Sequence, residues 1–323
     1  MSFAILLINF PYSLKLIGVK MKSTTCVWII LLLISSKSYS QEIVNKNFDV
    51  VADNQQFPEG AAWDGINSIY SSNCYGNWIT KITADKADTF LIKPTQPFDF
   101  GKTNGLTFDK NGNLFACDYS EGKILIISPK GKCEIYTDGF EGYKFNRPND
   151  LAFDKYGNLF FTDPKSYGKD LLDGRIFMIE NKTKKVIRLW DSLAFPNGIA
   201  ISKNGKNLFV CESAKNRILR FDLTKDGKIS DPKTFVELPG GDPDGIAFDI
   251  EENLYVAHFG GQAVYVVSAK GKIIQKIPVP GKKPSNLEFG GKDMKDLYIT
   301  EDETNCIYHT KSDIPGLKLF NHK

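Results

Sequence analysis

The sequence predicts an all-β protein, a six-bladed β-propeller with four antiparallel strands in each blade. The first observation is a motif that recurs six times, in which a polar residue flanked by Gly or Pro stands just before a short apolar run. Successive copies of this residue, called the anchor below, are separated by 41 to 48 residues, a period typical of propellers and solenoids. The second observation is that helical periodicity is absent and Gly-rich turns separate the apolar runs. The anchors are Glu59, Asn104, Asn149, Asn197, Asp244 and Ser285.

The second repeat shows the four strands of one blade most clearly. Its runs of strand-forming residues are 106–109, 114–119, 123–129 and 133–138. The turns between these runs read KNGN, SEG and KGK, and their Asn and Gly residues tolerate the positive φ that tight hairpins require. Four short strands in a unit of about 45 residues match a propeller blade, in which radial repetition leaves only short, protected edges.

The other repeats keep the same order of turns and strands, and together they predict one domain over residues 41–323. Clear copies begin at Thr103, Arg147, Phe195 and Asp242, and diverged copies at Phe57 and Lys283. A ring of blades must also be closed by one end of the chain. Residues 42–53 can add an outer strand to the last blade, and the tail at 316–320 is the competing candidate. We expect the N-terminal segment to close the ring.

Residues 1–40 are typical of a secretory signal with an upstream extension. They contain four lysines and no acid, and the apolar run Val27–Ile34 is too short to span a bilayer as a helix. Met21 precedes that run as a candidate initiator, and Ser38–Ser40 supply small residues before Gln41. We therefore expect export to a periplasm or to the extracellular space. The alternative is an uncleaved membrane anchor.

The charge balance argues against nucleic acid as a partner. Removing the four lysines of residues 1–40 from the 41 basic residues leaves 37 against 38 acidic ones. This part of the chain has no basic stripe of the kind that nucleic-acid binding requires. A small-molecule substrate is the expected partner.

The anchor column predicts a metal site. Each anchor lies where the chain enters the innermost strand of a blade, so anchors of different blades should converge on one mouth of the central channel. Glu59, Asn149, Asn197 and Asp244 then offer two carboxylates and two amide carbonyls, hard oxygen donors that suit Ca²⁺ best. Mg²⁺ and Mn²⁺ are alternatives, and Zn²⁺ is less expected because the column lacks His and Cys.

The alternative interpretation of the column is that these residues only form turns, as most Asn and Asp residues before strands do. Glu59 argues against it, because glutamate is a poor turn former. For Asn104 and Ser285 we favour the structural role, although Asn104 is kept as a candidate substrate contact.

A second polar column lies at the end of the second strand of each repeat. Its members are Asn73, Asp118, Asp163, Glu212, His258 and Glu301. Because the second strand is antiparallel to the first, these residues return to the same mouth. Asp163 and His258 are the candidate substrate contacts, and His258 is also a candidate for proton transfer. The alternation of faces equally allows these side chains to bind the backbone of neighbouring loops.

The motifs FPEG, RPND, FTDP, PNG and PDG, in this order, resemble those of the gluconolactonase and regucalcin family over about residues 42–312. The resemblance implies one divalent cation, usually calcium, held by Glu59, Asn149, Asn197 and Asp244. It also implies a substrate contact at Arg147. The chain departs from the commoner FTDPxYG form by reading FTDPKSYG, which has one additional residue and could reshape the substrate wall.

Together these features predict a metal-dependent hydrolase that opens a lactone or a related ester. Asp244 is the candidate general base and Glu59 the permanent ligand, and the two assignments could be exchanged. Two alternatives remain open: a secreted calcium-binding propeller without turnover, and a phosphotriester hydrolase of the diisopropyl fluorophosphatase type.

Overall fold

The computed structural model describes residues 41–76, 78–92 and 100–319. These residues belong to a unit that spans residues 39–323, and the expected signal at 1–40 lies outside the described part. The described residues form β-strands and one short 3₁₀ helix, η2 (Ser213–Lys215). Within the described ranges, no helix is long and apolar enough to cross a membrane.

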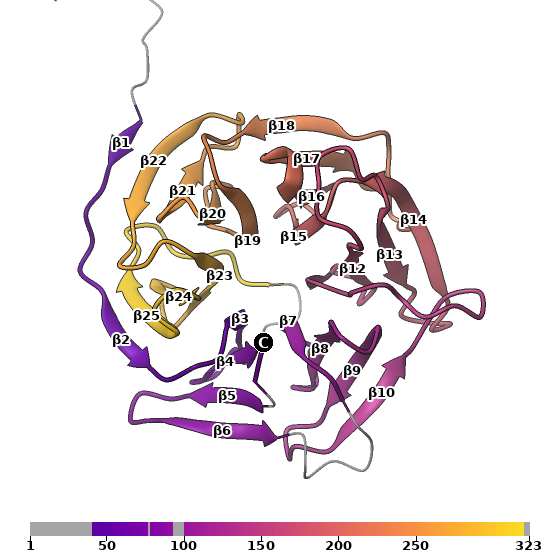
Figure 1. Cartoon of the computed structure of the whole chain (residues 1–323), viewed down its shortest axis with the longest axis horizontal. Coiled ribbons are helices and arrows are strands. Elements are labelled where there is room, and N and C mark those ends of the chain that lie inside the picture. The colour runs from indigo at the N-terminus through magenta and orange to yellow at the C-terminus, as the bar shows by residue number, and fades with distance from the viewer. Residues whose placement is uncertain (1–40, 77, 93–99, 320–323) are drawn as a thin grey trace, which may run out of the picture. The chain divides into compact units, whose positions relative to one another are not determined.

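The strands form six sheets arranged as blades around a central axis, as predicted (Figure 1). Blade 1 contains β3 (Pro58–Trp63), β4 (Ile69–Asn73), β5 (Trp78–Ile82) and β6 (Ala87–Ile92). Blade 2 contains β7 (Thr103–Phe108), β8 (Leu114–Asp118), β9 (Lys123–Ile127) and β10 (Cys133–Thr137). Blade 3 contains β11 (Leu151–Phe153), β12 (Leu159–Asp163), β13 (Gly174–Ile179) and β14 (Val186–Leu193).

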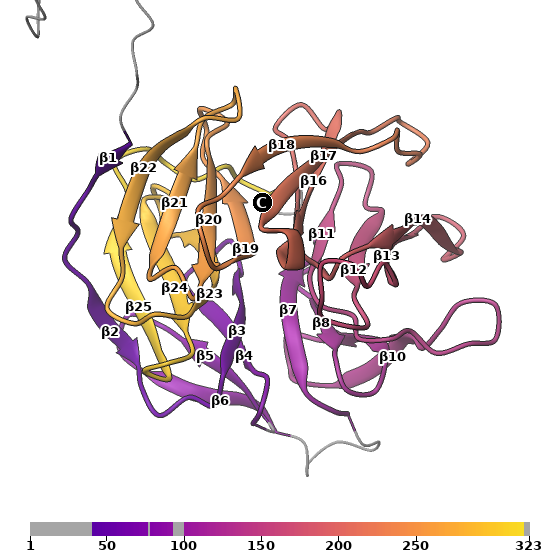
Figure 2. The same ribbon diagram turned by 45° about the horizontal axis from the view of Figure 1, so that its top comes forward.

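The second half of the ring repeats this order (Figure 2). Blade 4 contains β15 (Pro196–Ile201), β16 (Asn207–Glu212), β17 (Arg217–Asp222) and β18 (Lys233–Glu237). Blade 5 contains β19 (Asp242–Phe248), β20 (Leu254–Phe259), β21 (Ala263–Val267) and β22 (Ile273–Pro278). Blade 6 contains β23 (Pro284–Gly290), β24 (Asp296–Glu301) and β25 (Cys306–Lys311). In every blade the first strand is the innermost one.

The N-terminal segment closes the ring, which confirms the favoured prediction. Strand β2 (Asp49–Ala52) pairs antiparallel with β25 and supplies the fourth strand of blade 6. Strand β1 (Glu42–Ile43) pairs in parallel with β22, so the same segment also adds an edge strand to blade 5.

The hydrophobic core fills the spaces between neighbouring blades. Between blades 1 and 2, Tyr70 and Phe108 pack in one cluster, with their rings edge to face at 5.1 Å. Trp63 of blade 1 shares a cluster with Phe289 of blade 6, so the gap where the ring closes is filled as well. Burying each such large side chain contributes about 1.5–3 kcal/mol of transfer free energy.

The C-terminal segment runs to the mouth of the channel opposite the anchors. Figure 1 shows the yellow end of the described chain running inward to the centre of the ring. The Leu317 backbone N–H donates to the carbonyl of Phe248, the last residue of β19. Leu317 and Leu319 also line a cavity beside Glu288 and the far ends of the innermost strands.

Candidate functional site

The structure brings five of the six anchors to one cavity. Each anchor lies near the start of an innermost strand, and the cavity at that mouth has a volume of about 180 Å³. The anchors that line it are Glu59, Asn104, Asn149, Asn197 and Asp244. Ser285 does not line it, because its hydroxyl donates to the Pro58 carbonyl at 2.7 Å. The structural role expected for Ser285 is therefore confirmed, whereas Asn104 lies in the cavity wall.

Two local features aim the anchors inward. The pairing register shifts around the anchor in blades 1, 2, 4 and 5, as in a β-bulge, which re-aims side chains next to many active sites. The anchors of blades 1, 2, 4 and 5 are followed by glycine. A Cβ on Gly60 would collide with the backbone of Asn104, and one on Gly198 would collide with that of Asp244. The glycines therefore let the innermost strands approach closely around the channel.

Three oxygens in this cavity have no hydrogen-bond partner among the described residues. They are Glu59 Oε2, Asn149 Oδ1 and Asp244 Oδ1, all buried and contributed by three different blades. Buried polar atoms are nearly always paired in folded proteins, so three orphans around one cavity point to a missing partner. A hard cation satisfies carbonyl and carboxylate oxygens at once.

The electrostatics of the two acids support the same interpretation. Burial, followed by the negative charge of Asp150, raises the pKa of Glu59 to about 8. Burial also raises the pKa of Asp244 well above its ordinary range, with Glu59 as the next cause. The charge of Glu59 thus disfavours ionisation of Asp244 in the absence of a cation. Nowhere in the described part of the chain do three His, Cys, Asp or Glu side chains form a metal-binding group, so a cation here would depend on the amide oxygens too.

Asp302 is an acid of this region that the sequence patterns missed. Both of its carboxylate oxygens are buried without a partner among the residues described. Burial, followed by the charge of Glu59, raises its pKa to about 10. Asp302 comes directly after the second polar column, and that position was its available signal.

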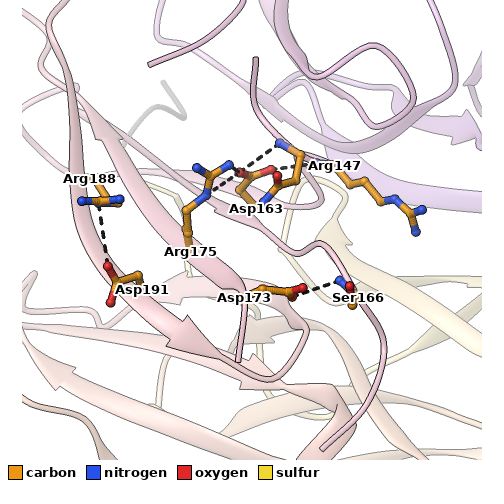
Figure 3. Close-up of polar contacts among 8 residues, drawn as sticks. Arg147, Asp163, Ser166, Asp173, Arg175, Arg188 and Asp191 are labelled. Atoms are coloured by element: carbon orange, nitrogen blue, oxygen red, sulfur yellow. Dashed lines mark hydrogen bonds and ion pairs between the residues drawn. The ribbon is translucent and has the colours of Figure 1, made fainter. Parts of the chain in front are cut away.

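The second polar column does not face the cavity, which corrects the prediction for Asp163 and His258. Asp163 is fully buried and accepts backbone N–H groups from Asn146 at 3.1 Å and Arg147 at 2.8 Å. It also pairs with Arg175 at 2.6 Å (Figure 3). Asp118 and Glu212 bind loop N–H groups in the same way. The column therefore fixes the loops that lead into the anchors.

His258 has a structural environment as well. Its Nε2 lies 3.1 Å from the Oδ1 of Asn216, and the side chain is fully buried. Burial lowers its pKa to about 4, so the imidazole is neutral near pH 7. His258 is not among the residues that line the cavity.

Arg147, the predicted substrate contact, lies against a residue of the cavity wall. Figure 3 shows its side chain extending away from Asp163. The guanidinium lies over the ring of Tyr119 at 5.6 Å from the centroid, and Nη1 donates to the Tyr119 hydroxyl at 3.4 Å. Tyr119 in turn lines the cavity.

The aromatic part of the cavity wall was missed by sequence reasoning. It consists of Phe57, Tyr75, Tyr119, Tyr167, Phe195 and Phe259. Two of these residues, Phe57 and Phe195, stand two positions before an anchor, and Tyr119 and Phe259 directly follow the second polar column. Successive side chains of a strand point to opposite faces, so the residue after a loop-binding acid turns toward the cavity.

Fold and site together define the class of protein: a six-bladed propeller that gathers oxygen donors from several blades at one channel mouth. The chain belongs to the SMP-30/gluconolactonase/LRE-like family, whose model matches residues 57–302. The resemblance inferred from the motifs is thereby confirmed.

Individual relatives agree with this assignment. The chain is 30% identical over 244 residues to lactonase drp35 of Staphylococcus saprophyticus, which covers 71% of this chain and 72% of the relative. It is 30% identical over 249 residues to the diisopropyl-fluorophosphatase of Loligo vulgaris, which covers 72% of this chain and 79% of that enzyme. The fold matches the calcium-binding protein regucalcin of Agrobacterium tumefaciens with a TM-score of 0.75 at 18% identity, covering 88% of this chain and 100% of that chain.

Proposed function

We propose that this protein is a lactone hydrolase that depends on a divalent cation, with Ca²⁺ the best-suited ion. The observation that carries the proposal is the set of three orphaned oxygens on Glu59, Asn149 and Asp244 around one cavity. Asn197 lines the same cavity and completes a set of two carboxylates and two amides. The relationship to lactonase drp35 supports lactones as the substrate class.

The roles of the residues follow from their positions. A divalent cation bound at these oxygens supplies Lewis acidity, which polarises a carbonyl and stabilises the oxyanion. Asp244 is our candidate to accept the proton of the attacking water, through a carboxylate oxygen that does not hold the cation. Glu59 stays a ligand in this assignment. Arg147, at the rim over Tyr119, orients polar groups of the substrate.

The test is acid release from a panel of sugar, aliphatic and aromatic lactones. The protein is first stripped with a chelator and then assayed with Ca²⁺, Mg²⁺ or Mn²⁺ added back. We expect hydrolysis only in the presence of a divalent cation. If calorimetry shows Ca²⁺ binding while no substrate in the panel is hydrolysed, the protein is a binding propeller instead.

A second candidate function is phosphotriester hydrolysis, favoured by the 30% identity to the diisopropyl-fluorophosphatase. The same Lewis-acid chemistry would serve a phosphoryl oxygen. Adding diisopropyl fluorophosphate to the panel ranks the two activities by their kcat/KM values.

We also propose export of the protein to a periplasm or the extracellular space, on the strength of the charged start and apolar run before Gln41. N-terminal sequencing of the protein from cell fractions would test this. An exported form that starts at Gln41 is expected, and a cytoplasmic form that keeps residues 1–40 would contradict it.

A further inference from the structure

Three exposed cations stand at the rim of the cavity, at equivalent positions of three repeats. Lys102, Arg147 and Lys283 each precede an anchor by two residues. The same position in the other repeats is occupied by Phe57, Phe195 and Asp242. These six positions, two residues before each anchor, are called the rim column below. The rim column therefore contains three cations and one acid.

Each of these cations lies over an aromatic ring that faces the mouth. Lys102 Nζ is 4.7 Å from the ring centroid of Tyr75, and Lys283 Nζ is 5.6 Å from that of Phe259. Arg147 lies over Tyr119 in the same way. All three rings line the cavity, so the ring faces hold the cationic groups at its edge.

The charges of the two lysines act on buried groups behind the rim. Lys102 lowers the pKa of Cys74, against the larger effect of burial, and Lys283 does the same for Asp302. The cations also lie along one arc of the mouth. Phe57 of blade 1 connects their rings, with its centroid 4.3 Å from that of Tyr75 and 6.3 Å from that of Phe259.

None of the three cations has a carboxylate partner within the described residues. By contrast, Lys282 pairs with Glu303 at 3.6 Å, next to Lys283 in the sequence. The one acid of the rim column is occupied, because Asp242 Oδ2 accepts a hydrogen bond from the Tyr167 hydroxyl at 2.7 Å. The arc formed by blades 6, 1, 2 and 3 thus presents unpaired positive charge to whatever enters the cavity.

We propose that the substrate is a lactone that carries an anionic group, such as a phosphate, sulfonate or carboxylate. Lys102 and Lys283 bind that group together with Arg147, while the ring carbonyl faces the anchors. Charge-assisted hydrogen bonds from ammonium and guanidinium groups to such oxygens are strong and directional. This inference rests on the proposed lactonase function and narrows its substrate class.

The test compares two substrates that differ only in the anionic group, glucono-δ-lactone and its 6-phosphate. We expect kcat/KM for the phosphorylated lactone to exceed that for the neutral one by about tenfold or more at low salt, because the rim attracts and holds the phosphate. Raising the salt concentration to 0.5 M should reduce this preference, since exposed charges are screened.

The variants Lys102→Met and Lys283→Met should each lower the preference about three- to tenfold. Lys130→Met, which removes the same charge from an exposed turn between β9 and β10, should leave it unchanged. Equal kcat/KM values for the two lactones would overturn the inference. So would rim variants that slow both substrates equally.

A binding measurement separates this inference from the proposed function. If neither lactone is hydrolysed, calorimetry can still measure anion binding at the rim. It would compare the affinities of 1,5-anhydroglucitol and its 6-phosphate, whose rings cannot be opened by hydrolysis. Tighter binding of the phosphate, lost in the Lys102→Met and Lys283→Met variants, would support the anion site without lactonase activity. Equal or absent binding of both compounds would refute it.

Discussion

At the scale of the residue, the site is marked by groups that the fold leaves unsatisfied. Glu59 and Asp244 are both buried in the wall of one cavity, and burial together with the charge of Glu59 raises the pKa of Asp244. Such an arrangement costs stability unless a cation compensates it. If these carboxylates bind a cation, removing one of them should increase the stability of the metal-free protein. If they only pack, removing one should decrease that stability.

The first prediction concerns Asp244→Asn. Without metal, this variant should raise the free energy of unfolding by about 1–2 kcal/mol, because it removes a repelling buried charge. With Ca²⁺, it should bind the ion about 10- to 100-fold more weakly and lose most hydrolysis, because an amide is a poorer ligand and no base.

Denaturant unfolding with and without a chelator, together with calorimetry, measures both effects. Asp138→Asn, at an exposed position, is the matched control. Lower stability of Asp244→Asn in the chelator would show that the carboxylate has a packing or hydrogen-bonding role that the structure does not reveal.

The second prediction concerns His258 and pH. Its pKa is about 4 in the folded protein against 6.5 ordinarily, so the unfolded state binds a proton more readily. Folding stability is therefore intact above about pH 6.5 and falls as the pH drops toward 4, by about 2.5 kcal/mol at pH 4.5.

Replacing His258 by Gln removes this titration and can keep a hydrogen bond to Asn216. The difference in unfolding free energy between the variant and the native chain should thus change by about 2.5 kcal/mol between pH 7 and pH 4.5. A difference that is independent of pH would mean that the imidazole is charged in the folded state.

The sequence predicted some of these site residues and misassigned others. The anchors were identifiable because all six share one repeat position, and five of them line one cavity. Asp163 and His258 were misassigned because a shift of one residue along a strand reverses the side chain's face. Period and polarity locate a column, but they do not say which of two adjacent columns faces the channel.

At the scale of the element, the loop between β12 and β13 shapes the cavity wall. Ser166 N–H donates to Asp173 Oδ1 at 3.0 Å within this loop (Figure 3). Tyr167 packs edge to face on Phe195 at 5.3 Å and reaches blade 5 through its bond to Asp242. This loop carries the additional residue of the FTDPKSYG motif. Its course was not predictable, because no other repeat contains an equivalent loop.

The third prediction follows from this tether. Tyr167→Phe removes one charge-assisted hydrogen bond, so the loop should be less ordered and KM should rise about three- to tenfold. The change in kcat should stay within about twofold, because the anchors are untouched. Steady-state kinetics and hydrogen exchange of residues 164–173 measure the two effects.

Tyr143→Phe is the control, because that exposed hydroxyl has no partner in the described part of the chain. An unchanged KM together with unchanged exchange in Tyr167→Phe would mean that the loop is held by packing alone.

At the scale of the whole molecule, the ring is closed by two short strands of the N-terminal segment. The repeat predicted six blades because Gly and Asn turns recur with a period of 41 to 48 residues. The sequence alone did not show which end of the chain closes the ring, because residues 42–53 and 316–320 both had strand-forming composition. In the structure, β2 pairs with the outer edge of β25 and closes the ring. The C-terminal segment is instead bonded to Phe248 at the far mouth.

The fourth prediction concerns this closure. Chains that begin at Val44 lack only the exposed strand β1 and should match a chain that begins at Gln41 in stability. Chains that begin at Asn54 also lose β2 and with it the buried Ala52, which exposes the edge of β25 and the core residues that pack against Ala52. We expect a loss of at least about 3 kcal/mol, or aggregation, for that truncation. Equal melting temperatures of all three chains would contradict closure by β2.

The position of the C-terminal segment has a practical consequence. Leu317 is bonded to the far end of β19, whereas Asp244 lies near the beginning of the same strand. A surface coupled through the C-terminus would therefore hold the molecule by the face opposite the cavity. Immobilised in this way on a sensor chip or a resin, the protein would present its anchor mouth to the flowing solution.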